Sequence, residues 1–146
     1  MQAAEPYATS HPAIQGTRPL RVFIVEDSPV LREHLTEALS SLRMVEVAGH
    51  AETETAAIAA LKAESFDAVV LDLQLKEGHG FNVLRAMRAH PDTARIDVLI
   101  LTNHATPQYR TRSIALGADY FFDKSREYDL LCETLVDLAT RKTEAS

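Results

Sequence analysis

The chain is poor in the features that would tie it to a membrane or to an oxidising compartment. It has one cysteine, Cys132, which excludes an internal disulfide and favours a reducing compartment. No apolar run is long enough to span a bilayer. Residues 1–19 lack both the basic start and the apolar stretch of a secretory signal. We therefore expect a cytoplasmic protein that does not insert into a membrane.

Positive charge is also in short supply. The 15 lysines and arginines are outnumbered by 21 aspartates and glutamates, and the net charge of -6 disfavours nonspecific binding to nucleic acid. Apolar residues make up 46% of the 146, which suits one domain with a real core. Because prolines and small polar residues fill the start of the chain, we expect a flexible arm at residues 1–19, one domain at residues 20–141 and a tail at residues 142–146.

Short β-branched runs alternate with amphipathic helical patterns from residue 20 onward. Strands are predicted at residues 21–26, 45–51, 67–75, 96–102 and 118–123, and helices at residues 28–42, 53–62, 81–90, 107–116 and from a cap at Ser125 to about 140. Such alternation predicts a parallel sheet with helices on both faces. The continuous apolar runs VFIV, AVVL and VLIL are typical of strands buried on both sides. The expected fold class is therefore α/β, a doubly wound five-stranded parallel sheet.

Asp72 stands inside the apolar run DAVVLDLQL, where a lone carboxylate is costly to bury unless it has partners. In open parallel sheets, sites form beyond the carboxyl ends of the strands. The other groups predicted at those ends are Glu26, Asp27, Thr102 and Lys124. Crowded carboxylates need protons or a cation, hard oxygen ligands suit Mg²⁺, and a lysine suits phosphoryl oxygens. This set predicts phosphoryl transfer, with Asp72 as a nucleophile that forms an aspartyl-phosphate.

Each of these groups taken alone has a simpler explanation. An acidic pair such as Glu26-Asp27 is favoured at a helix N-terminus, and a carboxylate such as Asp72 can cap the end of a strand. A single lysine is most often a solvated surface residue, and a single threonine is most often an ordinary strand residue. The prediction therefore depends on their convergence at one edge of the sheet.

Four motifs, in their order and spacing, resemble the receiver domain of bacterial two-component response regulators. They are VEDS (25–28), LDLQL (71–75) with a glycine beyond, LILT (99–102) and GADYFFDKS (117–125). The resemblance covers about residues 20–140 and implies the flavodoxin-like strand order 2-1-3-4-5. Because the chain ends at Ser146, with no room for a DNA-binding domain, the resemblance suggests a stand-alone receiver like the chemotaxis regulators.

The resemblance implies specific roles for the acidic residues. Asp72 matches the phosphoacceptor, which takes a phosphoryl group from the phosphohistidine of a histidine kinase. Glu26 and Asp27 match the acidic pair that binds Mg²⁺ or Mn²⁺, together with Asp72 and the backbone carbonyl of Gln74. The metal is therefore expected to be held by oxygen ligands from two loops.

The resemblance also implies a switch. Thr102 and Lys124 match the residues that engage the phosphoryl group and relay its presence, and Phe121 matches an aromatic switch residue that turns inward. The family's output face is formed by its fourth helix, fifth strand and fifth helix, here roughly residues 107–140. We expect this face to bind a downstream protein when Asp72 is phosphorylated.

Four positions near the predicted phosphoryl site are expected to set rates. Gln74 and His104 match positions that in this family tune how fast water removes the phosphate. Lys76 stands where proline is usual and Asn103 where a small residue is usual, so these two put the speed of phosphorylation in question.

Three functions follow from these patterns. The first is a phosphoacceptor signalling protein that is not an enzyme with a separate substrate, and its partners are a sensor histidine kinase, a histidine phosphotransfer protein or both, and a downstream protein. The second is a degenerate receiver that binds proteins without phosphorylation, which Lys76 and Asn103 keep open. The third is a flavodoxin-type electron carrier, which the acidic EDSPVLRE segment after the first strand disfavours because it would repel a phosphate.

Overall fold

The computed structural model describes residues 18–145, so the predicted arm lies almost wholly outside the described residues. The strands are β1 (Leu20–Val25), β2 (Val45–Ala51), β3 (Ala68–Leu71), β4 (Asp97–Thr102) and β5 (Tyr120–Asp123). The helices are α2 (Pro29–Ser40), α3 (Glu54–Ala63), α4 (Gly80–Ala89), α5 (Pro107–Ala115) and α6 (Tyr128–Ala145). All strand pairs are parallel and their order is β2-β1-β3-β4-β5, which confirms the predicted fold class and strand order.

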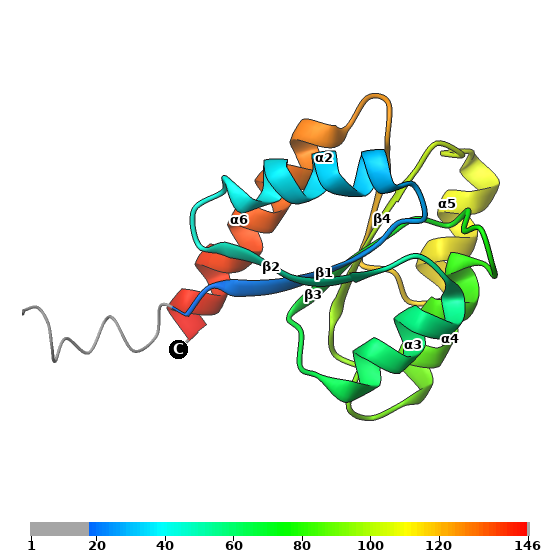
Figure 1. Ribbon diagram of the computed structural model, residues 1–146, viewed down its shortest axis with the longest axis horizontal. Helices are drawn as coiled ribbons and strands as arrows, with labels where there is room; N and C mark the ends of the chain where they lie inside the picture. Colours follow the sequence, from blue (N-terminus) through cyan, green and yellow to red (C-terminus); the bar gives the residue numbers. More distant parts are fainter. Residues whose placement is uncertain (1–17, 146) are drawn as a thin grey trace, which may run out of the picture.

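The sheet lies between two helical layers, with α2 and α6 on one face and α3, α4 and α5 on the other (Figure 1). Alternate side chains of each strand enter opposite layers, as the two-residue period of a strand requires. In β5, Phe121 packs with the layer of α3, α4 and α5, and Phe122 packs with the layer of α2 and α6. Both faces of the sheet are therefore core. Within residues 18–145, no helix combines the length and the apolar character needed to cross a membrane.

Polar residues at the helix starts explain where the helices begin. Ser28 caps α2 as predicted, since its side chain accepts a hydrogen bond from the N–H of Leu31, and Pro29 occupies the first helical position. Thr53 and Thr106 cap α3 and α5 in the same way. These helices follow parallel strands, so their caps lie at the carboxyl edge of the sheet and fix the loops there.

Several boundaries differ from the prediction by one or two residues, and the end of the third strand and both ends of the last helix are the differences that matter here. The third strand is shorter than residues 67–75 and ends at Leu71, which leaves Asp72 just beyond it. The last helix begins at Tyr128, because the Asp123 carboxylate accepts hydrogen bonds from the N–H and hydroxyl of Ser125 and holds a turn there. That helix continues to Ala145, past the predicted end near residue 140, so residues 142–145 are helical.

The partly buried carboxyl of Asp97, at the start of β4, should make the stability of the protein depend on pH. Its burial, helped by the charge of Asp119, raises the pKa of the Asp97 carboxyl. The folded state thus holds this proton more tightly, and the resulting stabilisation is lost as the pH rises above about 4 and through the raised pKa. We expect Asp97→Asn to increase the free energy of unfolding at pH 7 by about 0.5 kcal/mol, after allowance for solvent screening.

Thermal unfolding of the wild type and the Asp97→Asn variant at pH 7 and pH 5 measures this effect, and the gain should be smaller at pH 5. Asp92→Asn is the control, because the Asp92 side chain is 81% exposed near the same edge of the sheet. A wild type as stable as the Asp97→Asn variant at both pH values would contradict the prediction.

Candidate functional site

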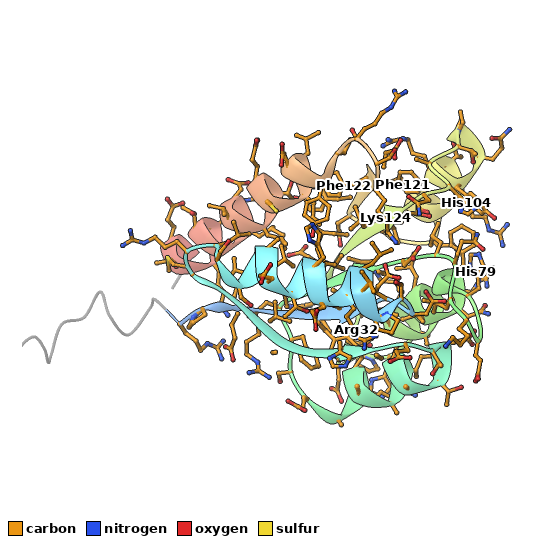
Figure 2. All side chains as sticks on the ribbon, turned by 45° about the horizontal axis from the view of Figure 1, so that its top comes forward. Arg32, His79, His104, Phe121, Phe122 and Lys124 are labelled. Atoms are coloured by element: carbon orange, nitrogen blue, oxygen red, sulfur yellow. The ribbon has the colours of Figure 1, made fainter. Side chains whose placement is uncertain are left out.

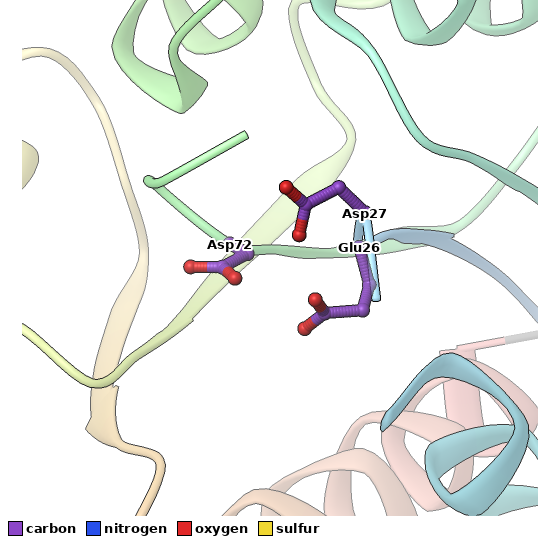
Figure 3. Close-up of side chains that lie close together, drawn as sticks. All are labelled: Glu26, Asp27 and Asp72. Atoms are coloured by element: carbon purple, nitrogen blue, oxygen red, sulfur yellow. The ribbon is translucent and has the colours of Figure 1, made fainter. Parts of the chain in front are cut away.

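Three carboxylates meet at the carboxyl edge of the sheet. Glu26 and Asp27 follow β1, Asp72 follows β3, and one carboxylate oxygen from each lies within 4.8 Å of the others. Figure 3 shows the side chains of Glu26, Asp27 and Asp72 close together. Glu26 and Asp72 are only 3% and 7% exposed, so their charges are poorly solvated. The structure thus brings together the acidic residues that the sequence predicted would converge.

Lys124 supplies the opposing charge from the end of β5. Its Nζ donates hydrogen bonds to Glu26 Oε1 at 2.7 Å and to Asp72 Oδ2 at 2.9 Å. Burial, the largest influence, lowers the pKa of Lys124, but the hydrogen bonds and charges of the two carboxylates together outweigh it and raise that pKa. Lys124 therefore stays charged and bridges the two buried carboxylates.

The charged form of Glu26 is still disfavoured in spite of this bridge. Burial, the largest influence, and the charge of Asp72 raise the pKa of Glu26 against the hydrogen bonds from Lys124 and the N–H of Ser28. Three carboxylates and one ammonium leave an excess of negative charge in a poorly solvated place. The donor set is all oxygen, which fits a hard divalent cation such as Mg²⁺.

The backbone around the acidic residues holds them in place. The N–H of Gln74 donates to Asp72 Oδ1 at 3.2 Å, and the N–H of Asp72 donates to the carbonyl of Val25 at 3.0 Å, which joins the two acidic loops. Gly80 lies against this loop so closely that a Cβ there would come within 2.5 Å of the Asp72 carbonyl oxygen. Glycine at this position lets α4 start directly beneath the site.

Arg32, which no sequence motif singles out, supports the acidic loop from α2 (Figure 2). One guanidinium nitrogen, Nη1, lies 3.2 Å from the Glu26 carbonyl oxygen and 3.1 Å from a carboxylate oxygen of Glu52. The side chain joins α2 and the loop after β2 to the loop that carries the acidic pair. Its place about one turn into α2 gives no local pattern that would predict this contact.

Thr102 lies beside Lys124 at the ends of the neighbouring strands β4 and β5. It is fully buried, and its carbonyl accepts a hydrogen bond from the N–H of Lys124 at 2.9 Å. Its hydroxyl oxygen accepts from the N–H of His104 at 3.1 Å, which leaves the hydroxyl proton to donate. Phe121 is 4% exposed, and the Arg110 guanidinium of α5 lies 4.8 Å from the centre of its ring.

The rate-setting candidates occupy the rim of this site. Asn103, His104, Gln74 and Lys76 are all exposed, and they come from the loops after β3 and β4. The Gln74 side chain reaches the hydroxyl of Tyr109 in α5. Their effects on phosphorylation and hydrolysis remain predictions, as does the metal-binding role of the Gln74 carbonyl.

Comparisons with known proteins identify the family of this chain. Residues 22–136 match the family model of the response regulator receiver domain. The gliding motility regulatory protein of Myxococcus xanthus is 31% identical over 128 residues, which are 85% of this chain and only 15% of that protein. The chain thus spans a minor part of this curated relative.

Two solved structures show the same architecture. The signal receiver domain of the putative response regulator NarL from Mycobacterium tuberculosis matches with a TM-score of 0.76 and 28% identity, over 84% of this chain and 98% of that one. The receiver domain of the sensor histidine kinase PA1611 from Pseudomonas aeruginosa, with magnesium coordinated in its active-site cleft, matches with a TM-score of 0.69 and 20% identity, over 84% and 98%. At that identity the second likeness shows the fold alone. From its family match, its strand order and its acidic edge, this chain belongs to the response regulator receiver family of two-component signalling.

Proposed function

We propose that this receiver takes a phosphoryl group onto Asp72 in the presence of Mg²⁺ or Mn²⁺, from the phosphohistidine of a sensor histidine kinase or a histidine phosphotransfer protein. One observation carries the proposal: the buried Asp72 carboxylate lies 2.9 Å from Lys124 Nζ, beside the carboxylates of Glu26 and Asp27. Phosphoryl transfer depends mainly on alignment and charge neutralisation, which this arrangement provides.

The transfer itself uses groups that are already in position. An Asp72 oxygen forms a bond to phosphorus while the P–N bond of the phosphohistidine breaks, and the imidazole nitrogen keeps the electron pair. Lys124 lies where it can neutralise charge on the phosphoryl oxygens. The N–H of Gln74 fixes the orientation of the Asp72 carboxylate. A divalent cation held by Glu26, Asp27 and Asp72 would add positive charge on the same group, and the all-oxygen donor set of these residues supports this assignment.

The signal then passes to the face formed by α5, β5 and α6. Thr102 donates its hydroxyl proton to the phosphoryl group and shifts toward it. Phe121, which pairs with Ile100 of the strand that ends in Thr102, changes its packing in response. Because the Arg110 side chain rests on Phe121, this change alters the surface of α5. Phosphorylation biases a two-state equilibrium of this face, which binds a downstream protein.

The binding-module alternative is not favoured, because Glu26, Asp27, Asp72 and Lys124 form a complete charged constellation. In the proposed function the domain catalyses only its own phosphorylation and dephosphorylation. Its action in the cytoplasm and without nucleic acid stays a prediction from the sequence.

Incubation with acetyl phosphate, with and without Mg²⁺, tests the proposal by intact mass and by backbone amide spectra. We expect a Mg²⁺-dependent gain of one phosphoryl group in the wild type and none in Asp72→Asn, which keeps the shape of the side chain without its charge. Amide shifts should spread over residues 107–140 when beryllofluoride and Mg²⁺ mimic the phosphoryl group. A gain that persists in Asp72→Asn would exclude Asp72 as the acceptor, and unchanged shifts along residues 107–140 would exclude the switch.

Gln74 and His104 are expected to set the lifetime of the phosphorylated state. Both lie at the rim of the site. The backbone N–H of each is hydrogen-bonded to Asp72 or Thr102, so the exposed side chain of each starts next to the reacting groups, and alanine removes that side chain without removing the backbone hydrogen bond. We expect Gln74→Ala and His104→Ala each to change the dephosphorylation rate constant by about three- to tenfold. The decay of phosphoprotein mass after removal of the donor measures it, and Arg126→Ala, exposed beyond β5, serves as the control. A rate unchanged by either substitution would remove that residue from the proposal.

A further inference from the structure

Tyr109 occupies a central place among the loops that surround Asp72. It stands in the first turn of α5, where its N–H donates to the Thr106 cap at 3.1 Å. Its ring centre lies 5.7 Å from that of Phe81 and 6.3 and 6.4 Å from those of His104 and His79. Figure 2 shows His79 and His104 at the same end of the molecule. The loop after β3, the start of α4 and the loop after β4 therefore all contact one side chain.

These contacts restrict how the Tyr109 ring can move. Phe81 and Tyr109 are partly buried and pack against the core of the α3, α4 and α5 layer, so apolar neighbours hold the Tyr109 side chain. His104 meets the ring edge-on at 84°, a favourable arrangement for two aromatic groups. His79 is itself fixed, because its Nδ1 accepts a hydrogen bond from the N–H of Phe81 at the start of α4. A ring held on several sides carries its hydroxyl to a defined point.

At that point the hydroxyl meets Gln74. The Gln74 Nε2 donates to Tyr109 Oη at 3.4 Å, a long hydrogen bond, while the Gln74 backbone N–H donates to Asp72 Oδ1. Gln74 is thus tied at its backbone to the predicted phosphoacceptor and at its amide to α5. With Nε2 engaged by Tyr109, the Gln74 Oε1 remains available as an acceptor for water.

We infer that Tyr109 is a positioning residue that holds the Gln74 amide to orient the water which hydrolyses phospho-Asp72. The inference rests on the proposed function and deepens it. In the hydrolysis, the water oxygen bonds to phosphorus as the bond from phosphorus to the Asp72 oxygen breaks. The electron pair of that bond stays on the carboxylate, and the protons of the water leave with orthophosphate. A glutamine amide that orients an attacking water speeds phosphoryl hydrolysis, and a fixed amide does so better than a mobile one.

Tyr109→Phe tests the inference because it keeps the ring and removes only the hydroxyl. Phosphoprotein made with acetyl phosphate and Mg²⁺ is freed of donor, and its decay is followed by intact mass. We expect decay in Tyr109→Phe to be about three- to tenfold slower than in the wild type, the effect of one lost hydrogen bond. Tyr120→Phe is the matched control, since the Tyr120 hydroxyl meets only the Arg141 guanidinium at the opposite edge of the sheet among the contacts of residues 18–145, and its decay should equal the wild type's.

The double variant separates positioning from a structural role. If Tyr109 acts through the Gln74 amide, Gln74→Ala slows decay by itself, and adding Tyr109→Phe to it slows decay no further. A wild-type or faster rate in Tyr109→Phe overturns the inference, and so does an equal slowing with and without Gln74.

The side-chain amide resonances of Gln74 give a second measurement, made on the unphosphorylated protein. They should shift in Tyr109→Phe and stay in place in Tyr120→Phe. Resonances that do not shift in Tyr109→Phe would show that the Tyr109 hydroxyl does not hold the Gln74 amide. A wild type that takes up no phosphoryl group contradicts the proposed function instead, and these resonances still decide whether Tyr109 holds Gln74.

Discussion

Replacing Lys124 with methionine is expected to lower the free energy of unfolding by about 3 kcal/mol in the absence of Mg²⁺, and to slow phosphorylation of Asp72 by about 100-fold. The ammonium bridges Glu26 and Asp72 at 2.7 and 2.9 Å, and its side chain is 11% exposed. Methionine keeps the length of the stem but leaves two neighbouring carboxylates without a countercharge. Protonation of Glu26, whose pKa burial already raises, limits the loss of stability.

Urea unfolding without and with Mg²⁺, and intact mass after incubation with acetyl phosphate, measure the two effects of Lys124→Met. The stability deficit should shrink in Mg²⁺, because a cation among the carboxylates replaces part of the missing charge. Lys142→Met is the control, since Lys142 Nζ forms an ion pair with Asp67 at 2.8 Å in which both side chains are more exposed. The Lys142→Met protein should lose about 1 kcal/mol or less of its free energy of unfolding. A Lys124→Met protein as stable as the wild type without Mg²⁺ would show that the carboxylates need no countercharge to fold.

Arg88→Met is expected to lower the free energy of unfolding by about 3 kcal/mol while leaving phosphorylation of Asp72 unchanged. The Arg88 guanidinium, which projects from α4, donates hydrogen bonds to four groups in the segments before β4 and β5. They are the carbonyls of Ala94, Ile96 and Gly117 and the carboxylate of Asp119, at distances from 2.7 to 3.0 Å. Methionine retains most of the packing of the stem, so the loss reports these hydrogen bonds.

The same helix offers a matched control for Arg88→Met. Arg85 is exposed, and its guanidinium donates to the side chain of Asn82 at 2.8 Å, so Arg85→Met should cost about 0.5 kcal/mol or less. Arg88→Lys should be intermediate, because an ammonium keeps the charge but lacks the planar fork that reaches several acceptors. Equal unfolding midpoints for the Arg88→Met and Arg85→Met proteins would mean that water replaces the lost hydrogen bonds without cost.

The alternation of patterns along the chain determined the fold class, because strand and helix periods are local and repeat five times. Ser28 was recognisable as a helix cap for the same reason: its side chain meets the N–H of a residue only three positions away. The convergence of Glu26, Asp72 and Lys124 was also predictable. Once a sheet is parallel, its strand ends share one edge, so residues far apart in sequence are placed together by topology.

Tertiary packing alone decided the contacts that give this edge its chemistry. Lys124 bridges residues 98 and 52 positions away, and no periodicity encodes which oxygen its ammonium meets. Arg32 and Tyr109 look like ordinary helix residues in the sequence, yet one braces the carbonyl of Glu26 and the other the amide of Gln74. The turn at Ser125, which delays the last helix to Tyr128, also depends on where the end of β5 leaves Asp123. A local pattern fixes the direction and period of an element, whereas side-chain contacts depend on how distant elements pack against one another.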